Sequence, residues 1–374
     1  MSQDHANHPL RIAIVGAGSS GLMLALLLQR QGHEVVLLDQ RSAIQAAPCG
    51  VLLAPSGLAA LKGSGLEDLA GRLQNLGQPL RHVLVRNLRG TTIKEPELVP
   101  DGDLPPGLLI HRQLLLDALA TDLEPGRLLG GWQLLHADQD DHRVRLISVD
   151  GRQWQGDLLI GADGVFSCVA PLVVPSRQPC YLGERVWRGV VADDQFCGEG
   201  QCILYAHSYG IYAMAYDLGD ARQDQRQSHW GVFLDQSLPE DADERRRQLL
   251  EPIPEAALAR LPEDFRRLIA GTPIEGQVSD WFFDLDPLPA LARGRVALIG
   301  DAGHAMSSSQ ARGLSSGLED AECLARVLAA QTDDPIAALQ TYAKERLPEV
   351  HRLQKVARLK TQRIREVTRR LGLS

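Results

Sequence analysis

Near the start of the chain, apolar residues form three separate segments. Each segment has the length of one strand or one helix. Residues 11–15 and 34–38 are short apolar runs rich in β-branched side chains. Residues 22–31, between them, are apolar and consist mostly of good helix formers. This pattern predicts a strand, a helix and a second strand. That order is typical of a βαβ unit, whose two strands lie parallel in a buried sheet.

After residue 180 the pattern of apolar and polar residues changes and predicts mainly strands. Strand-like segments predominate between residues 181 and 283, where we expect an antiparallel sheet with helices on one side. The predicted strands are 81–88, 90–94, 108–110, 131–137, 143–149, 153–160, 184–191, 201–206, 211–217, 229–234 and 295–299. The predicted helices are 56–61, 66–76, 111–123, 239–250, 254–270, 315–330 and 335–371.

The order of these strands and helices predicts an α/β fold. In the predicted fold, a Rossmann-like nucleotide-binding domain carries an inserted antiparallel-sheet substrate domain and a C-terminal helical tail. The nucleotide-binding domain consists of three segments: 10–80, 108–180 and 286–332. The substrate domain consists of a hairpin, 81–107, and the block 181–285. The tail, 333–374, is strongly basic. It is either a membrane-surface or partner helix, or a solvated helix packed on the body, and we favour the second interpretation.

Three glycines follow the first predicted strand at the spacing of a nucleotide-binding turn. Gly16 permits a tight turn, Gly18 lets the backbone approach a pyrophosphate, and Gly21 allows close packing of the helix on the strand. The N-terminus of that helix offers free N–H groups and a positive dipole to phosphates. Asp39 ends the second strand, where a carboxylate can accept hydrogen bonds from ribose hydroxyls. The complete unit predicts a dinucleotide site but leaves NAD and FAD open.

Composition excludes several other classes of protein. The chain has 374 residues, 44% of them hydrophobic, which is enough for a large core, and its net charge of −8 argues against a nucleic-acid binder. No apolar run is long enough for a transmembrane helix, and the polar residues 1–9 lack the apolar region of a secretory signal, so we expect a disordered leader. The six scattered cysteines favour free thiols in the cytoplasm. No spacing of His, Cys and Glu suggests a metal site.

Two more motifs combine glycine and an acid after a predicted strand. Residues 161–167 read GADGVFS, and residues 300–306 read GDAGHAM and continue through Gly313 to residues 319–321. With the first glycine motif, in this order and spacing, they resemble the FAD-dependent aromatic hydroxylases, which are class A flavoprotein monooxygenases of the para-hydroxybenzoate hydroxylase type. The resemblance extends over roughly residues 10–350.

The resemblance implies FAD as the cofactor and NAD(P)H as a co-substrate. Asp301 is placed to accept hydrogen bonds from ribityl or ribose hydroxyls. The helix start at 313–320 can turn its N–H groups toward the N1–C2=O edge of the flavin, where a positive dipole stabilises the anionic reduced form. The implied cofactor-binding residues are Gly16, Gly18, Ser20, Gly21, Asp39, Arg41, Arg112, Asp163, Gly164, Gly300, Asp301, Gly313, Leu314 and Ser315.

Catalysis on a flavin needs no protein nucleophile, so the catalytic residues stay unknown at this point. The candidates near the flavin are His304, Ser308 and Arg312. We interpret His304 as a residue that shapes the flavin loop rather than as a general base.

The third motif departs from the pattern of the family. Ser308 stands where a proline is expected, Ala311 replaces a glycine, and Arg312 replaces a glutamine. We expect Ala311 to require ordinary φ angles and to change the path of the loop. Arg312 brings a positive charge that would stabilise reduced flavin or hold an anionic substrate. Ala170 replaces the arginine that usually ends the second motif, which weakens the case for NAD(P)H handling typical of the family.

The leading interpretation is an FAD-dependent monooxygenase. It would use NAD(P)H and O2 to oxygenate a small aromatic or polycyclic substrate through a flavin C4a-hydroperoxide, as the resemblance implies. The alternatives are an FAD oxidase, dehydrogenase or reductase on the same scaffold, which the altered flavin loop favours, and a non-catalytic FAD-binding protein. The oligomeric state stays open between a monomer and a homodimer.

Overall fold

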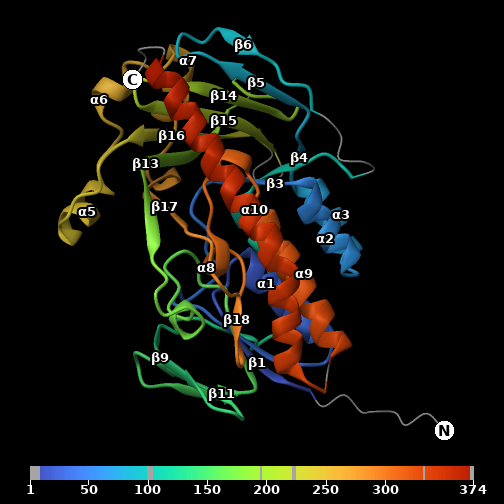
Figure 1. Cartoon of the computed structure of the whole chain (residues 1–374). Helices are drawn as coiled ribbons and strands as arrows, with labels where there is room; N and C mark the ends of the chain where they lie inside the picture. Colours follow the sequence, from blue (N-terminus) through green and yellow to red (C-terminus); the bar gives the residue numbers. More distant parts are fainter. Residues whose placement is uncertain (1–8, 99–103, 194–195, 221–224, 332, 371–374) are drawn as a thin grey trace.

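The computed structural model describes residues 9–98, 104–193, 196–220, 225–331 and 333–370. Most of the predicted leader, the middle of the loop after residue 95 and the last four residues of the tail lie outside these ranges. Two large sheets, each with its own helices, make up the body, and helix α10 (Pro335–Arg370) runs along the length of the molecule (Figure 1).

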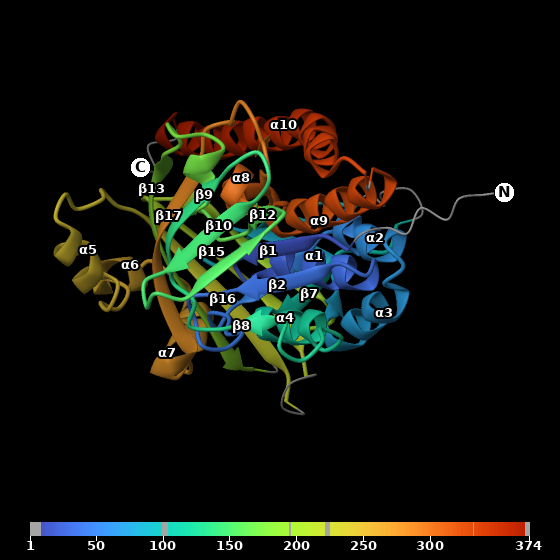
Figure 2. The ribbon, with the colours of Figure 1, turned by 90° about the horizontal axis from the view of Figure 1, so that it is seen from below.

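The first sheet has six strands in the order β18-β19-β12-β1-β2-β8. All neighbours pair in parallel except β18, which is antiparallel to β19. The strands are β1 (Arg11–Val15), β2 (Glu34–Leu38), β8 (Leu128–Leu129), β12 (Leu158–Gly161), β18 (Ala292–Arg293) and β19 (Val296–Leu298). This order places β1 beside both β2 and β12, so the predicted βαβ unit forms the centre of the sheet (Figure 2).

Helix α1 (Ser19–Arg30) is buried on every side. Its residues from Gly21 to Leu28 are all buried, because the helix lies between the sheet, α4 (Arg112–Ala120) and α9 (Gly313–Ala330). A helix that is apolar all round belongs in the interior of a protein, as this one does. The start of α1 is therefore a fixed point of the fold.

The second sheet has seven strands in the order β17-β13-β16-β15-β14-β5-β6. All pairs are antiparallel except β14 with β5. The strands are β5 (His82–Arg86), β6 (Thr92–Lys94), β13 (Pro179–Ala192), β14 (Gln201–Ser208), β15 (Ile211–Gly219), β16 (Gln227–Asp235) and β17 (Gln277–Leu285). Helices α6 (Glu255–Leu258) and α7 (Glu263–Ala270) pack on its outer face. Tyr216 and Leu218 of the inner face pack against Leu109 of the nucleotide-binding part.

Two three-stranded sheets and several helices complete the architecture. One sheet has the order β3-β7-β4 and the other β11-β10-β9. Their strands are β3 (Gly50–Leu53), β4 (Gln78–Pro79), β7 (Leu108–His111), β9 (Leu134–Gln139), β10 (Val144–Ser148) and β11 (Gln153–Gly156). The other helices are α2 (Pro55–Gly63), α3 (Glu67–Leu76), α5 (Ala242–Gln248) and α8 (Asp301–His304).

The single strand predicted over residues 153–160 is wrong, because the chain forms two strands there in different sheets. Asp157 separates β11 from β12 and accepts a hydrogen bond from the N–H of Arg11 at 2.7 Å. A Cβ at Gly156 would lie 2.6 Å from the carbonyl oxygen of Arg11, so the chain passes β1 at a distance that only glycine allows.

Two other differences have local causes. The helix predicted over 254–270 is divided, because Pro262 lacks the N–H that a helix interior needs and instead stands at the N-cap of α7. Strand β17 is not predicted, because its sequence QVSDWFFDL does not alternate between apolar and polar residues. Pairing with β13 determines its conformation.

Candidate active site

The first glycine motif forms a turn in which two positions accept only glycine. Gly16 has a φ of 110°, and a Cβ there would lie 2.3 Å from the carbonyl oxygen of Ala162. A Cβ on Gly21 would lie 2.0 Å from the carbonyl oxygen of Gly16. Gly18 differs, because no atom lies within 4 Å of its Cβ position. The turn is therefore closed on its protein side and open beside Gly18, where the backbone can approach a phosphate.

Asp39 holds this turn against the end of β2. One of its carboxylate oxygens accepts the N–H of Ala17 at 2.8 Å, and the other accepts the N–H of Arg41 at 2.8 Å. Each oxygen keeps further lone pairs, so Asp39 can still accept from a hydroxyl group. Arg41 donates its guanidinium to the carbonyl of Gln45 at 3.1 Å, which orders the loop after β2.

The second motif lies directly against the first, because Gly16 packs on Ala162. Asp163 accepts the N–H of Cys168 at 2.7 Å, while its Oδ1 is buried and has no hydrogen-bond partner among the described residues. Burial raises the pKa of Asp163 above the usual range, although nearby hydrogen bonds oppose the shift. Gly164 has a φ of 80° and no atom within 4 Å of its Cβ position. The turn thus has open space beside a carboxylate with unused acceptor capacity.

The third motif meets the start of α1 through small residues. A Cβ on Gly300 would lie 2.8 Å from the hydroxyl oxygen of Ser20, and one on Gly317 would lie 2.1 Å from it. Asp301 is the exposed first residue of α8, and its Oδ1 lies 3.8 Å from the Cβ position of Gly313, where α9 begins. The acid of the third motif therefore stands next to a helix N-terminus, whose first N–H groups have no acceptor inside the helix.

The expectation that Ala311 imposes ordinary φ angles is wrong. Ala311 has a φ of 52° and a ψ of 34°, which is the left-handed conformation that favours glycine. It follows the single turn of 3-10 helix at Ser308–Gln310 and precedes the N-terminus of α9. Adopting this conformation costs an alanine roughly 1–2 kcal/mol, which the surrounding contacts must offset. Ala311 therefore adopts the conformation that the glycine expected at this position would adopt without strain.

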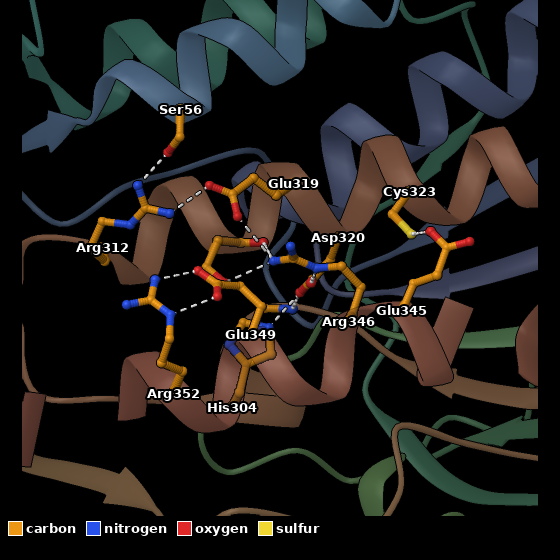
Figure 3. Close-up of polar contacts among 12 residues, drawn as sticks. Ser56, His304, Arg312, Glu319, Asp320, Cys323, Glu345, Arg346, Glu349 and Arg352 are labelled. Atoms are coloured by element: carbon orange, nitrogen blue, oxygen red, sulfur yellow. Dashed lines mark hydrogen bonds and ion pairs between the residues drawn. The ribbon is translucent and has the colours of Figure 1, made fainter. Parts of the chain in front are cut away.

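The buried carboxylate of Asp320 forms hydrogen bonds that connect the third motif to helix α10 (Figure 3). It accepts the N–H of Gly300 at 2.8 Å, the Nε2 of His304 at 2.5 Å and the Nε of Arg346 at 2.7 Å. Burial lowers the pKa of His304, but the charge of Asp320 outweighs it and the net shift is upward. His304 is fully buried and bonded to Asp320, which supports a structural role for it.

Further ion pairs connect Arg346 of this cluster to the loop residue Arg312 (Figure 3). Arg346 donates to Glu319 at 3.1 Å, and Glu319 accepts the Nη2 of Arg312 at 2.8 Å. The other terminal nitrogen of Arg312 donates to Ser56 of α2 at 2.5 Å. Because Glu319 is the direct partner of Arg312, much of the positive charge that the sequence brings to the loop is compensated inside the protein.

Three other predicted cofactor-binding residues differ in whether the side chain or only the backbone can reach a ligand. Ser315 is fully buried, and its hydroxyl accepts the N–H of Ala54 at 2.9 Å, while Leu314 packs against the core. Only their backbone N–H groups are left for a ligand. Arg112 has an exposed side chain at the first position of α4, and its own N–H donates to Cys49 at 2.9 Å.

The sequence patterns assign no role to three residues of this site. Asp320 belongs to the third motif, as one of residues 319–321, while Arg346 and the turn residue Arg177 lie outside all three motifs. Arg346 occupies α10 and Asp320 occupies α9, so only the packing of these two helices reveals the pair. Among the described residues, no group of three or more His, Cys, Asp or Glu side chains has a metal-binding arrangement.

The three motifs together fit an extended dinucleotide better than a single mononucleotide. Open backbone at Gly18 and Gly164 and the carboxylates of Asp39, Asp163 and Asp301 lie along the carboxyl ends of β1, β2, β12 and β19. One Rossmann unit binds an ADP moiety with its first two strands, so the acids after β12 and β19 are available to the rest of a longer cofactor. This arrangement fits FAD.

Comparison with known proteins gives the family. The FAD binding domain family matches residues 10–357. The 3-amino-4-hydroxybenzoate 2-monooxygenase of Streptomyces cremeus is 31% identical over 92% of this chain and 85% of its own length. The 6-hydroxynicotinate 3-monooxygenase of Bordetella bronchiseptica is 28% identical over 93% of this chain and 90% of its own. HpxO of Klebsiella pneumoniae, solved with FAD and uric acid, has a TM-score of 0.78 at 26% identity, covering 93% of this chain and 87% of its own.

The chain belongs to the class A FAD-dependent aromatic hydroxylases. Its predicted family, its α/β fold class and its class of enzyme, an FAD-dependent monooxygenase that uses NAD(P)H, are thereby confirmed. No helix in the part of the chain that the structure describes is both long enough and apolar enough to cross a membrane.

Replacing Asp320 with asparagine should destabilise the protein in a pH-dependent way. The pair of Asp320 with His304 raises the pKa of His304 above its ordinary value of 6.5. Its stabilisation is therefore full below that value and is lost as the pH rises through the raised pKa. We expect a loss of roughly 3–5 kcal/mol near pH 6 and a smaller loss near pH 9.

Thermal unfolding of both proteins across this range measures the difference. Asp243→Asn, in an exposed ion pair on α5, is the matched control and should change little at any pH. If the loss of stability in Asp320→Asn is the same at every pH, the ion pair of Asp320 with a protonated His304 does not stabilise the protein.

Proposed function

We propose that this monooxygenase oxygenates a small aromatic substrate that lies between the third motif and the inner face of the seven-stranded sheet. The observation that carries the proposal is the meeting of all three motifs at the carboxyl ends of one parallel sheet, while the inner face of the seven-stranded sheet packs on Leu109 of β7. The fourteen implied cofactor-binding residues, from Gly16 to Ser315, and the domain boundaries predicted from the sequence belong to the same proposal.

The inner face supplies a surface suited to a flat ring. The register of β13, β15 and β16 aligns one side of the sheet, which carries Arg188, Tyr212, Met214, Tyr216, His229 and Phe233. Tyr212 and Phe233 have ring centroids 5.4 Å apart, and Phe233 and Phe282 of β17 are 5.8 Å apart. Aromatic walls of this kind bind planar apolar surfaces and exclude water.

Arg188 is the polar group on this face that favours an acidic or carbonyl-bearing ring, while His229 is buried and neutral. Arg188 pairs with Asp280, and its Nε is buried without a hydrogen-bond partner among the described residues. Burial lowers the pKa of His229 to about 3, so its imidazole is neutral, and its Nδ1 lies 3.0 Å from the carbonyl oxygen of Gly189. A carboxylate or carbonyl oxygen on the substrate would satisfy the donor of Arg188.

The names of the relatives agree with this class of substrate. They refer to 6-hydroxynicotinate, 3-amino-4-hydroxybenzoate and salicylate, and other relatives are urate hydroxylases. We extend the same class, small oxygenated aromatic or heteroaromatic rings, to this chain. We also propose O2 as the oxidant, a cytoplasmic location, which the six free cysteines support, and a monomer or homodimer.

Each part of the chain has a separate task in the reaction. FAD, when bound, supplies the redox chemistry and the activation of oxygen. The first motif and Asp39 bind the ADP end, and Asp301 binds hydroxyl groups nearer to the flavin. The N–H groups that begin α9, at Gly313 and Leu314, would stabilise negative charge on the bound cofactor through the helix dipole. The inner face of the sheet orients the ring and keeps water away.

The purified holoenzyme should oxidise NADH or NADPH in air and release peroxide when no substrate is present. Addition of hydroxybenzoates, hydroxypyridine carboxylates or purines, one class at a time, should then identify the ligand that accelerates this oxidation. The decisive measurement is mass spectrometry of the product formed under ¹⁸O2, in which we expect one ¹⁸O atom. Flavin reduced only by the organic substrate, with no ¹⁸O incorporated, would instead favour an oxidase or dehydrogenase.

Removing the partner of Arg312 should change the reduction potential of the flavin. Glu319→Gln leaves the guanidinium of Arg312 uncompensated, so the anionic reduced flavin is stabilised and the potential should rise by tens of millivolts. Arg312→Gln should lower the potential, because it removes the cation and leaves the carboxylate of Glu319 with Arg346 as its partner. Anaerobic dye-coupled titration measures both values, and an unchanged potential in Glu319→Gln would refute a role for this pair near the flavin.

A further inference from the structure

Arg177 reaches back over the second motif from the turn that precedes β13. Its Nη2 donates to the carbonyl oxygen of Val165 at 2.6 Å and approaches that of Gly164 at 3.5 Å. These carbonyls belong to the turn that follows Asp163, so one side of the guanidinium is fixed on the backbone of the motif. Its place over the turn is therefore defined by the fold and does not depend on a ligand.

The rest of the guanidinium has unused donor capacity. The Nε of Arg177 is buried and has no hydrogen-bond partner among the described residues. Burial lowers the pKa of Arg177, and the charges of Asp163 and Asp301 raise it, which means that the cation lies within electrostatic reach of both acids. An unsatisfied, partly desolvated N–H group of a cation favours an anionic acceptor.

The space beside this cation is suited to a phosphate. Gly164 has no atom within 4 Å of its Cβ position, and the neighbouring residue Ala162 contacts the turn of the first motif at Gly16. A pyrophosphate at this point would otherwise meet the carboxylates of Asp163 and Asp301 with no compensating charge. A cation within electrostatic reach of both acids reduces that repulsion.

The position that lacks the expected arginine is buried among apolar side chains. Ala170 is completely buried in the apolar cluster under the six-stranded sheet, among Val144, Leu159 and Leu298. A long cationic side chain there would displace well-packed neighbours. Arg177 instead comes from outside this cluster, seven positions further along the chain, and arrives at the same turn.

We propose that Arg177 binds the pyrophosphate of a dinucleotide at the second motif and supplies the charge that Ala170 lacks. The inference rests on the proposed arrangement of the cofactor site. The pyrophosphate belongs either to FAD or to NAD(P)H, and a guanidinium binds both by the same forked, charge-assisted hydrogen bonds. Arg177 is a binding residue in this account and takes no part in the chemistry at the flavin.

The test compares Arg177→Ala, Arg177→Gln and Arg177→Lys with the native protein. FAD affinity is measured by flavin fluorescence on the apoprotein. Affinity for NADPH and NADH is measured on the holoenzyme from the dependence of the anaerobic flavin reduction rate on nucleotide concentration. Arg246→Ala, at an exposed position of α5, is the matched control.

We expect the alanine and glutamine variants to weaken one of the two affinities about 10- to 100-fold, with lysine intermediate, because lysine keeps the charge but not the fork. A loss confined to FAD assigns the site to FAD, and a loss confined to the reduced nucleotide assigns it to NAD(P)H. The control should bind both ligands as the native protein does.

Affinities for FAD, NADH and NADPH that all stay within twofold of the native values would overturn the proposal, whether or not the melting temperature falls. If the alanine variant does not fold, the lysine and glutamine variants decide, since lysine keeps nearly the full length of the side chain and glutamine keeps its aliphatic part. These binding measurements do not depend on oxygenation, so a failure of the proposed substrate class would leave their outcome unaffected.

Discussion

The close approach of three backbone turns is the constraint on which the site depends. Gly16 packs on the carbonyl of Ala162, and Ser20 fills the space left by the missing side chains of Gly300 and Gly317. Any larger residue at these positions would separate the ends of β1, β12 and β19. Because the turns touch, acids from distant parts of the sequence lie at the carboxyl ends of neighbouring strands. We propose that a cofactor extending over all three motifs is held by this backbone arrangement.

Beyond the contacts between the turns, ion pairs and hydrogen bonds hold the third motif in place. The buried carboxylate of Asp320 bonds to Gly300, His304 and Arg346, so helices α9 and α10 are joined to the third motif. The alternating chain of charges then continues through Glu319 to Arg312. Such a network is costly to leave incomplete, because every member is desolvated by its neighbours. Through this network, helix α10, whose sequence resembles a solvated basic tail, stabilises the loop that precedes α9.

Local pattern predicts the parts of this protein that depend on local physics. The βαβ unit, its glycine turn and the long last helix follow from short-range spacing, and the structure has them at the predicted positions. Ala311 shows the limit, because contacts around it override a conformational preference of roughly 1–2 kcal/mol. Pairings such as Asp320 with Arg346, and the reach of Arg177 to Val165, depend on how separate elements pack. No spacing within a single segment carries that information.

The central claim, that the three motifs form one site for an extended FAD, is tested most directly by comparing FAD with ADP. Calorimetric titration of the apoprotein should show that FAD binds far more tightly than ADP. Asp301→Ala should remove much of that advantage while leaving the affinity for ADP unchanged, because Asp301 lies beyond the ADP end. If Asp301→Ala binds FAD as tightly as the native protein, or loses ADP and FAD affinity equally, the third motif does not hold the flavin half and the account is contradicted.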